Sequence, residues 1–203
     1  MIKIVENNKG IRSFIAISLP DNIKIDIGNL SQQLKKNLTS SNIIISWVKP
    51  ESIHLTLKFL GTIDSSQIEP IVLKLNEIAA QTKPFSIAIE GLGVFPNFSH
   101  PRVLWVGIKG SAKEIGHLQR SIEEKMGELG FPSEKKEFNA HFTLGRIKSI
   151  KSRGIIGRAF HDIENQKIGN MEINNIKLIK STLLSSGAVY EQLGIAKFDQ
   201  NKQ

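Results

Sequence analysis

The stretch HLTLKFLG at residues 54–61 has a near copy later in the chain, HFTLGRI at residues 141–147. Both begin with the form His-apolar-Thr-Leu and both run on into a glycine. On a β-strand, residues i and i+2 point to the same face of the sheet. The histidine and the threonine of each copy therefore share a face. We predict two strands that each present one imidazole and one hydroxyl.

The opposite face of both strands is apolar, which is typical of a strand anchored on a hydrophobic core. It carries Ile53, Leu55, Leu57 and Phe59 in the first strand, and Phe142 and Leu144 in the second. By the same alternation, Lys58 should lie on the face of His54 and add positive charge there. Phe59 and Trp47 are expected in the core, although either ring could stack on a base in principle.

The rest of the chain mixes strands and helices in an order that favours an α+β fold over a doubly wound parallel sheet. Apolar periodicity predicts strands at 11–19, 43–48, 52–60, 85–95, 102–108, 140–147, 171–179 and 187–198. It predicts helices at 21–38, 66–80 and 111–129, with N-terminal caps at Asp21, Ser66 and Ser111. No linker rich in Pro, Gly or Ser divides the chain, so residues 1–203 are expected to form a single bilobal domain. Two similar lobes would share one cleft.

Composition narrows the class of protein. Hydrophobic residues make up 40% and charged residues 23% of the 203 residues, which is ordinary for a globular protein. No apolar stretch has the length of a membrane helix, the first residues lack a signal-peptide pattern, and there is no cysteine. We therefore expect a cytoplasmic protein with no membrane contact. The net charge of +8 favours a polyanionic partner, nucleic acid among them.

Two imidazoles with two hydroxyls suit the cleavage of a phosphodiester. One neutral histidine can take a proton from the nucleophile while one protonated histidine gives a proton to the leaving oxygen. Threonine hydroxyls can donate hydrogen bonds to phosphoryl oxygens. A zinc site would need a third protein ligand, and no acidic or histidine partner stands at ligand spacing beside either motif. We expect no metal and no cofactor.

The chain resembles the RNA 2′,3′-cyclic phosphodiesterases of the two-histidine phosphoesterase superfamily, bacterial and archaeal proteins historically named 2′-5′ RNA ligases. The resemblance covers most of the chain and departs from the family pattern at Ala140, where members often have proline. It rests on RSFIAISLP at 12–20, WVKPESIHLTLKFLG at 47–61, GLGVFPN at 91–97, PRVLWVG at 101–107, HFTLGR at 141–146 and LIKSTLLSSGAVY at 178–190.

The resemblance implies two lobes related by a pseudo-twofold axis, each with an antiparallel sheet, facing across a central cleft. It implies that His54 is the proton donor and His141 the proton acceptor, and that the product is a 2′-phosphomonoester. Thr56 and Thr143 would then hold phosphoryl oxygens. Arg146 matches the pattern as a further substrate-binding residue. Strand parity alone places Arg146 opposite His141, but a bend at the preceding glycine could turn it toward the phosphate.

Three functions stay open at this level. The first is hydrolysis of RNA or oligonucleotide 2′,3′-cyclic phosphate ends. The second is 2′-5′ RNA ligation at the same site, and the third is a non-catalytic nucleotide-binding module whose histidines only hold phosphate. The substrate could be a tRNA half, another RNA, a nucleotide or a small metabolite with a cyclic phosphate. Nothing in the sequence demands more than a monomer.

Overall fold

The computed structural model describes residues 10–39, 42–150, 155–160, 163, 165–185 and 187–199. Its strands are β1 Ile11–Ser18, β2 Ile43–Trp47, β3 His54–Ile63, β4 Phe85–Phe95, β5 Val103–Lys109, β6 His141–Ile150, β7 Lys167–Ile173, β8 Asn175–Leu184 and β9 Gly187–Lys197. Its helices are α1 Asp21–Leu38, α2 Ile68–Ala79, α3 Ala112–Glu128 and α4 Ile155–Phe160, with 3-10 turns at Pro50–Ser52 and Ser65–Gln67. The prediction of an α+β fold is confirmed.

The strand order reveals two related halves. The described strands form one antiparallel sheet in the order β7-β4-β5-β6-β3-β1-β8-β9, and β2 pairs with β6 outside this path. Four strands lie on each side of the junction between β6 and β3, and the two motif strands meet at that junction. The order is symmetric about the junction, as the predicted pseudo-twofold relation requires. The two halves are called the β3 lobe (β1, β3, β8 and β9) and the β6 lobe (β4 to β7 with β2).

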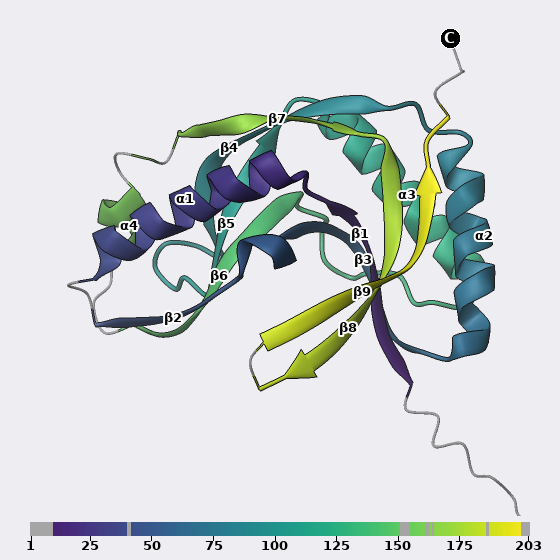
Figure 1. Ribbon diagram of the computed structural model, residues 1–203, viewed down its shortest axis with the longest axis horizontal. Coiled ribbons are helices and arrows are strands. Elements are labelled where there is room, and N and C mark those ends of the chain that lie inside the picture. Colours follow the sequence, from purple (N-terminus) through teal and green to yellow (C-terminus); the bar gives the residue numbers. More distant parts are fainter. Residues whose placement is uncertain are drawn as a thin grey trace, which may run out of the picture.

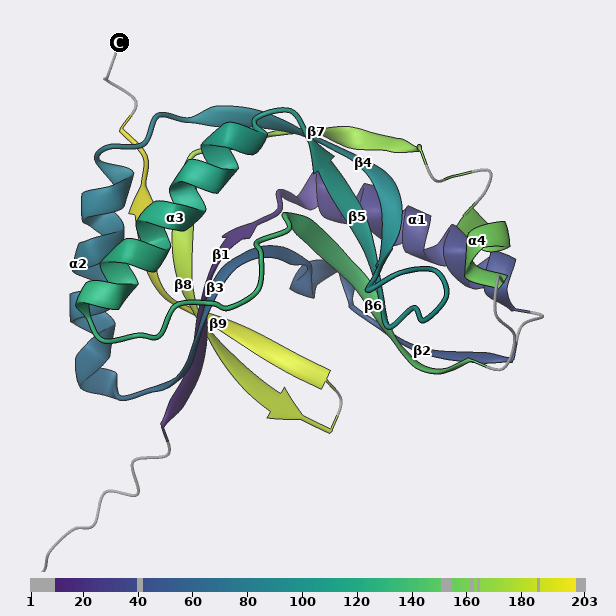
Figure 2. The ribbon, with the colours of Figure 1, turned by 180° about the vertical axis from the view of Figure 1, so that it is seen from behind.

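The lobes do not coincide with the two halves of the chain. The first strand, β1, lies between β3 and β8, so the β3 lobe combines N-terminal and C-terminal segments (Figure 1). Helices α2 and α3 pack together on this lobe, with α2 against β8 and β9 and α3 against β3 (Figure 2). Helix α1 instead contacts β7 and α4 of the β6 lobe. Each lobe is therefore covered by helices from a different stretch of sequence.

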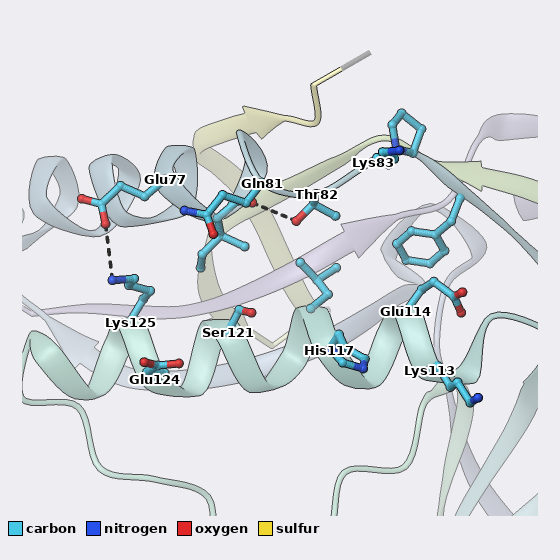
Figure 3. A pocket seen from close by; sticks show the side chains of 14 residues that line it. Glu77, Gln81, Thr82, Lys83, Lys113, Glu114, His117, Ser121, Glu124 and Lys125 are labelled. Carbon is cyan, nitrogen blue, oxygen red and sulfur yellow. Dashed lines mark hydrogen bonds and ion pairs between the residues drawn. The ribbon is translucent and has the colours of Figure 1, made fainter. Parts of the chain in front are cut away.

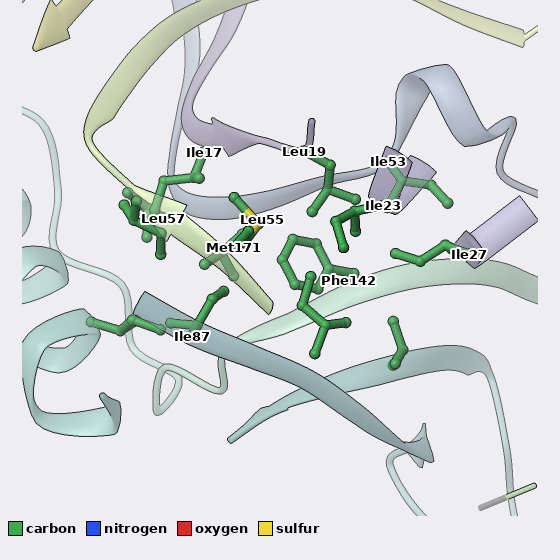
Figure 4. Packing of buried hydrophobic residues seen from close by; sticks show 14 of the residues in the cluster. Ile17, Leu19, Ile23, Ile27, Ile53, Leu55, Leu57, Ile87, Phe142 and Met171 are labelled. Atoms are coloured by element: carbon green, nitrogen blue, oxygen red, sulfur yellow. The ribbon is translucent and has the colours of Figure 1, made fainter. Parts of the chain in front are cut away.

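Helix α1 forms because apolar residues recur at 3–4 spacing. Ile23, Ile27, Leu30 and Leu34 are each at most 2% exposed. Burying a side chain of this size stabilises the fold by about 1.5–3 kcal/mol relative to leaving it in water. The same core receives Leu55 and Phe142 from the two motif strands, next to side chains of α1 and β7 (Figure 4). The apolar faces predicted for these strands thus hold the junction of the two lobes together.

The predicted helix caps were wrong in detail. Pro20 precedes α1, and Asp21 lies in its first turn, where it accepts a hydrogen bond from Lys24. The capping box before α2 is made by Asp64 and Gln67 rather than by Ser66 and Glu69. It caps the 3-10 turn Ser65–Gln67, which comes directly before the helix. Ser111 has a left-handed backbone (φ 43°) and makes no side-chain cap.

Two further boundaries differ from the sequence prediction. The stretch 171–179, predicted as one strand, contains the end of β7 and the start of β8, with Asn174 between them. The apolar alternation changes phase at Asn174 and Asn175, where the chain passes from β7 in one lobe to β8 in the other. The ambiguous stretch 151–168 contains the short helix α4 and the start of β7, while residues 151–154 lie outside the described residues. Among the described residues, no helix combines the length and the apolar character needed to cross a membrane.

Candidate active site

The four motif residues meet where the two lobes join. His54 is the first residue of β3 and His141 is the first residue of β6. The strands pair antiparallel at Leu55 and Phe142, which come one position after each histidine. Antiparallel pairing places the residue before Leu55 across from the residue after Phe142. Each histidine therefore lies across from the threonine of the other motif, and all four side chains share the sheet face away from the core.

Both imidazoles are fixed by the same hydrogen bond. Nδ1 of His54 lies 2.8 Å from the carbonyl oxygen of Ser52, and Nδ1 of His141 lies 2.6 Å from that of Asn139. A carbonyl oxygen only accepts, so each Nδ1 carries the hydrogen and donates it. The opposite nitrogen, Nε2, is then left to give or take a proton. Two histidines held in the same tautomer by equivalent backbone carbonyls form the centre of the candidate site.

Aromatic rings surround each imidazole. Phe14 of β1 stacks on His54 with ring centroids 4.6 Å apart, and Tyr190 of β9 meets the same imidazole edge-on at 5.1 Å. Phe95 of β4 meets His141 edge-on at 4.9 Å. These rings fix the imidazole planes and remove water from around them. The described aromatic contacts thus come from strands on both sides of the junction.

The pKa values of both histidines are lowered. Burial is the largest cause in each case, because an imidazolium is poorly solvated there. The nearby His141 lowers the pKa of His54 further, and the guanidinium of Arg146 lowers that of His141. The backbone hydrogen bonds oppose these effects and raise both pKa values. In the absence of substrate, both imidazoles are therefore mainly neutral at pH 7.

A β-bulge turns Arg146 toward the histidines. Thr143 pairs with Trp105 and Gly145 pairs with Leu104, so Leu144 has no partner on β5. The extra residue reverses the alternation of side chains along β6. Arg146 consequently shares the face of Thr143 instead of lying opposite it, and it is exposed to solvent. The sequence suggested that a bend next to Gly145 could turn Arg146 toward the phosphate. In the structure this bend is the bulge at Leu144.

The equivalent bulge in β3 overturns two expectations. Thr56 pairs with Ala16 and Lys58 pairs with Ile15, so Leu57 is left without a partner on β1. Lys58 therefore turns into the interior, where it is 2% exposed, and its ammonium binds Glu123 of α3 at 2.6 Å. Phe59, expected in the core, is 55% exposed instead.

Lys58 therefore does not add positive charge to the histidine face. It lies on the opposite face of the sheet and binds groups there. Besides Glu123, its ammonium donates to the carbonyl oxygen of Pro132 at 2.9 Å. The amide of Glu134 donates to the same Glu123 carboxylate at 3.3 Å. Pro132 and Glu134 belong to the segment that leads from α3 into His141. The ion pair, whose lysine is buried and whose carboxylate is partly exposed, thus connects β3 to the segment that leads into β6.

Tyr190, like Phe14 and Phe95, is a neighbour of the histidines that the sequence prediction missed. It ends the last matching stretch of the chain, but no role was assigned to it. Besides touching His54, it lies within the electrostatic influence of Arg146 and Arg12, which lower its pKa against the larger opposing effect of burial. Only the pairing of β9 with β8, and of β8 with β1, brings this distant residue to the histidines.

The groove between α2 and α3 lies apart from this site. It has a volume of about 880 Å³ and is lined by charged and polar side chains of both helices, among them Glu77, Lys125 and His117 (Figure 3). Since Lys58 points from β3 toward α3 while His54 points to the other face, the sheet separates the groove from the histidines. Across the described part of the chain, no group of three or more His, Asp or Glu side chains is placed to hold a metal ion.

Comparison with known protein families adds independent evidence. The family model described as LigT like Phosphoesterase matches residues 17–105 and again residues 106–190. The chain belongs to the LigT-like phosphoesterase family. The two successive matches each contain one His-x-Thr motif, in agreement with the duplication of the sheet. Family membership confirms the resemblance that the motifs indicated.

Curated members of this family are similar over most of the chain. An RNA 2′,3′-cyclic phosphodiesterase of Aquifex aeolicus is 35% identical over 165 residues, which cover 81% of this chain and 87% of that protein. The protein of the same name from Archaeoglobus fulgidus is 33% identical over 184 residues, covering 91% of this chain and 98% of its own.

Solved structures agree with the fold. A protein of Thermus thermophilus aligns with a TM-score of 0.77 at 23% identity and covers 95% of this chain and 100% of its own. E. coli LigT complexed with 3′-AMP aligns with a TM-score of 0.75 at 20% identity, with the same coverage. At these identities the likeness establishes the fold alone.

Proposed function

We propose that this protein hydrolyses 2′,3′-cyclic phosphate ends of RNA or oligonucleotides to 2′-phosphomonoesters. The observation that carries the proposal is the pair of tautomer-fixed imidazoles, His54 and His141, on one face at the junction of the lobes. The curated relatives named RNA 2′,3′-cyclic phosphodiesterase support the substrate class. The net charge of +8 suits a polyanion.

In this mechanism His141 is the general base and His54 the general acid. Nε2 of His141 takes a proton from water as the water oxygen bonds to phosphorus. The bond between phosphorus and the 3′ oxygen breaks, and Nε2–H of His54 gives that oxygen its proton. The products are a 2′-phosphomonoester and a free 3′ hydroxyl. No step requires a metal ion.

The protonated His54 arises when substrate binds. A cyclic phosphodiester carries one negative charge, and a negative charge close to an imidazole favours its protonated form. The phosphate therefore raises the pKa of His54 from its lowered value in the free enzyme. Arg146 sits nearer to His141, whose pKa it lowers, and so keeps the base neutral. The two imidazoles thus acquire the different protonation states that the reaction needs.

Thr56, Thr143 and Arg146 are the proposed phosphate-binding residues. Both threonines are half-buried on the histidine face, where their hydroxyls can donate to phosphoryl oxygens. The guanidinium of Arg146 adds charge-assisted hydrogen bonds to the oxygens that gain charge in the transition state. The β6 bulge supports this role because it turns Arg146 to their face.

The proposal is tested by phosphorus NMR of a short RNA with a 2′,3′-cyclic phosphate end, incubated with the protein in EDTA. We expect conversion to the 2′-phosphomonoester by the wild type, and almost none by His54→Ala or His141→Ala. A 3′-phosphate product would reverse the assigned leaving group. Tight binding without turnover would instead indicate a nucleotide-binding module, and ligation exceeding hydrolysis in the presence of a 5′-hydroxyl RNA would indicate a ligase.

A further inference from the structure

Phe59 occupies the position in the first motif that Arg146 occupies in the second. The sequences HLTLKF and HFTLGR align residue by residue, and each strand has its bulge at the leucine after the threonine. Phe14 pairs with Phe59 across β1 and β3, and Phe14 is the ring that stacks on His54. Phe59 therefore shares the histidine face, as Arg146 does.

The β3 bulge turns Phe59 outward, and its ring is not covered by the rest of the described fold. Its side chain is 55% exposed, whereas its sequence neighbours Lys58 and Leu60 are 2% and 7% exposed. Its ring lies 6.1 Å from that of Phe14, which in turn lies 4.6 Å from the imidazole of His54. Phe14 is 3% exposed and cannot receive a ligand ring itself. The imidazole of His54, the ring of Phe14 and the ring of Phe59 thus follow one another, and the last of them is exposed to solvent.

Positive charge accompanies this open ring. Arg12 lies two residues before Phe14 on β1, so it is on the same face, and its side chain is exposed. It pairs in register with Thr62, just beyond Phe59 on β3. Its influence on Tyr190 shows that it lies near the ring that touches His54. An exposed aromatic ring next to an arginine is the combination that binds single-stranded nucleic acid, by base stacking and phosphate contact.

Resting on the proposed function, we propose that Phe59 stacks on the base of the nucleotide 5′ of the terminal one, while Arg12 binds a phosphate of the same segment. The cyclic phosphate would lie between the histidines, near Arg146. Because Phe14 lies between Phe59 and His54, the exposed ring of Phe59 is farther from the histidines than the terminal nucleotide would be. The preferred substrate class is then an RNA of two or more nucleotides rather than a cyclic mononucleotide.

The test compares two substrates across a small set of variants. We would measure kcat/KM for a 2′,3′-cyclic mononucleotide and for a dinucleotide ending in the same 2′,3′-cyclic nucleotide. The variants are Phe59→Leu, which keeps apolar bulk but removes the π-face, and Phe59→Trp, which keeps a π-face. Leu73→Ala is the matched control, because Leu73 is 57% exposed on α2, on the far side of the sheet.

We expect the dinucleotide kcat/KM to fall about 5- to 100-fold in Phe59→Leu, the range given by loss of one base–aromatic stack. The mononucleotide kcat/KM should fall much less in Phe59→Leu. Phe59→Trp should keep the preference for the dinucleotide, and Leu73→Ala should leave kcat/KM for both substrates unchanged. Arg12→Gln should also weaken the dinucleotide selectively, and it should reduce the salt dependence of kcat/KM for that substrate.

Each contrary result has a distinct meaning. Equal losses on both substrates in Phe59→Leu would place the terminal base on Phe59 and overturn the upstream assignment. No loss on either substrate would overturn the stacking role altogether. Failure of the wild type to turn over either substrate would contradict the proposed function itself, which separates that failure from failure of the Phe59 subsite.

Discussion

The two motif strands, β3 and β6, are alike up to the leucine and differ directly after it. Both place a histidine and a threonine on one face, and both have a bulge at the leucine. The next residue points inward in both, but it is Lys58 in β3 and Gly145 in β6. A Cβ at Gly145 would lie 2.8 Å from Cγ2 of Ile45 on the neighbouring strand β2, so a side chain there would clash with Ile45. In β3 the same inward direction is open, and a lysine uses it to reach α3.

The following pair differs in chemistry rather than in position. Phe59 and Arg146 both return to the histidine face, one as an apolar ring and the other as a cation. The duplicated scaffold thus has symmetric His-x-Thr pairs and unlike flanking residues. Two equivalent histidines suit a reaction in which one imidazole acts as base and the other as acid. The unlike residues Phe59 and Arg146 suit a substrate that has an aromatic base on one side and a phosphate on the other.

The largest expected effect tests the symmetric part of the comparison. Replacing either His54 or His141 by alanine should lower kcat on a 2′,3′-cyclic dinucleotide by about 10²–10⁴-fold, the usual loss for a general acid or base. His117→Ala, in the groove between α2 and α3, is the control and should leave kcat unchanged. Wild-type kcat in either motif variant would show that the two strands are not functionally equivalent.

The next effect concerns the inward-pointing residues. Lys58→Met should lower the free energy of unfolding by about 1.5–3 kcal/mol, because it removes the cationic partner of the partly buried Glu123 carboxylate. That carboxylate then keeps its hydrogen bonds from Gln119 and the Glu134 amide. Urea titration measures this loss. The double variant Lys58→Met with Glu123→Leu should recover much of it, and Lys74→Met, which breaks only exposed ion pairs, should change little. Stability within about 1 kcal/mol of wild type in the single variant would argue against a structural role for Lys58.

A smaller effect distinguishes the flanking residues. Arg146→Gln should lower kcat/KM about 10- to 150-fold on mononucleotide and dinucleotide alike, since a hydrogen bond to a charged group is worth about 1.5–3 kcal/mol. Phe59 variants should instead separate the two substrates. Steady-state kinetics on both substrates decides this. If Arg146→Gln spared the mononucleotide, the cyclic phosphate would not lie at Arg146.

The smallest effect is a displacement of the pH optimum. The kcat/KM profile should be bell-shaped, and its centre is the mean of the two free-enzyme pKa values. Both values are lowered from 6.5, so the centre should lie below pH 6.5. The kcat profile should be centred at higher pH, because bound phosphate raises the pKa of His54. A kcat/KM optimum clearly above pH 6.5 would contradict the lowered pKa values.

Alternation and short motifs were enough to predict most of the strands, the α+β class and the two histidine faces. They failed after Leu57 and Leu144, because a bulge depends on pairing with a neighbouring strand and leaves no local sequence signal. This one device explains why Lys58 and Phe59 exchange their expected faces and why Arg146 joins the histidines. Tyr190 was missed for a related reason, since its place depends on pairing between distant parts of the chain.

The position of β1 between β3 and β8 has a consequence for how the protein folds. Pairing of Ser13 with Lys180 brings together residues from near the two ends of the described chain. The ring that stacks on His54 and the ring that meets it edge-on therefore come from opposite ends of the polypeptide. Contacts of such high sequence separation form late and slow the folding of small domains. We expect the local hairpins β4–β5 and β8–β9 to gain structure first and the pairing of β1 with β8 to form late, so that the two rings around His54 come together only near the end of refolding.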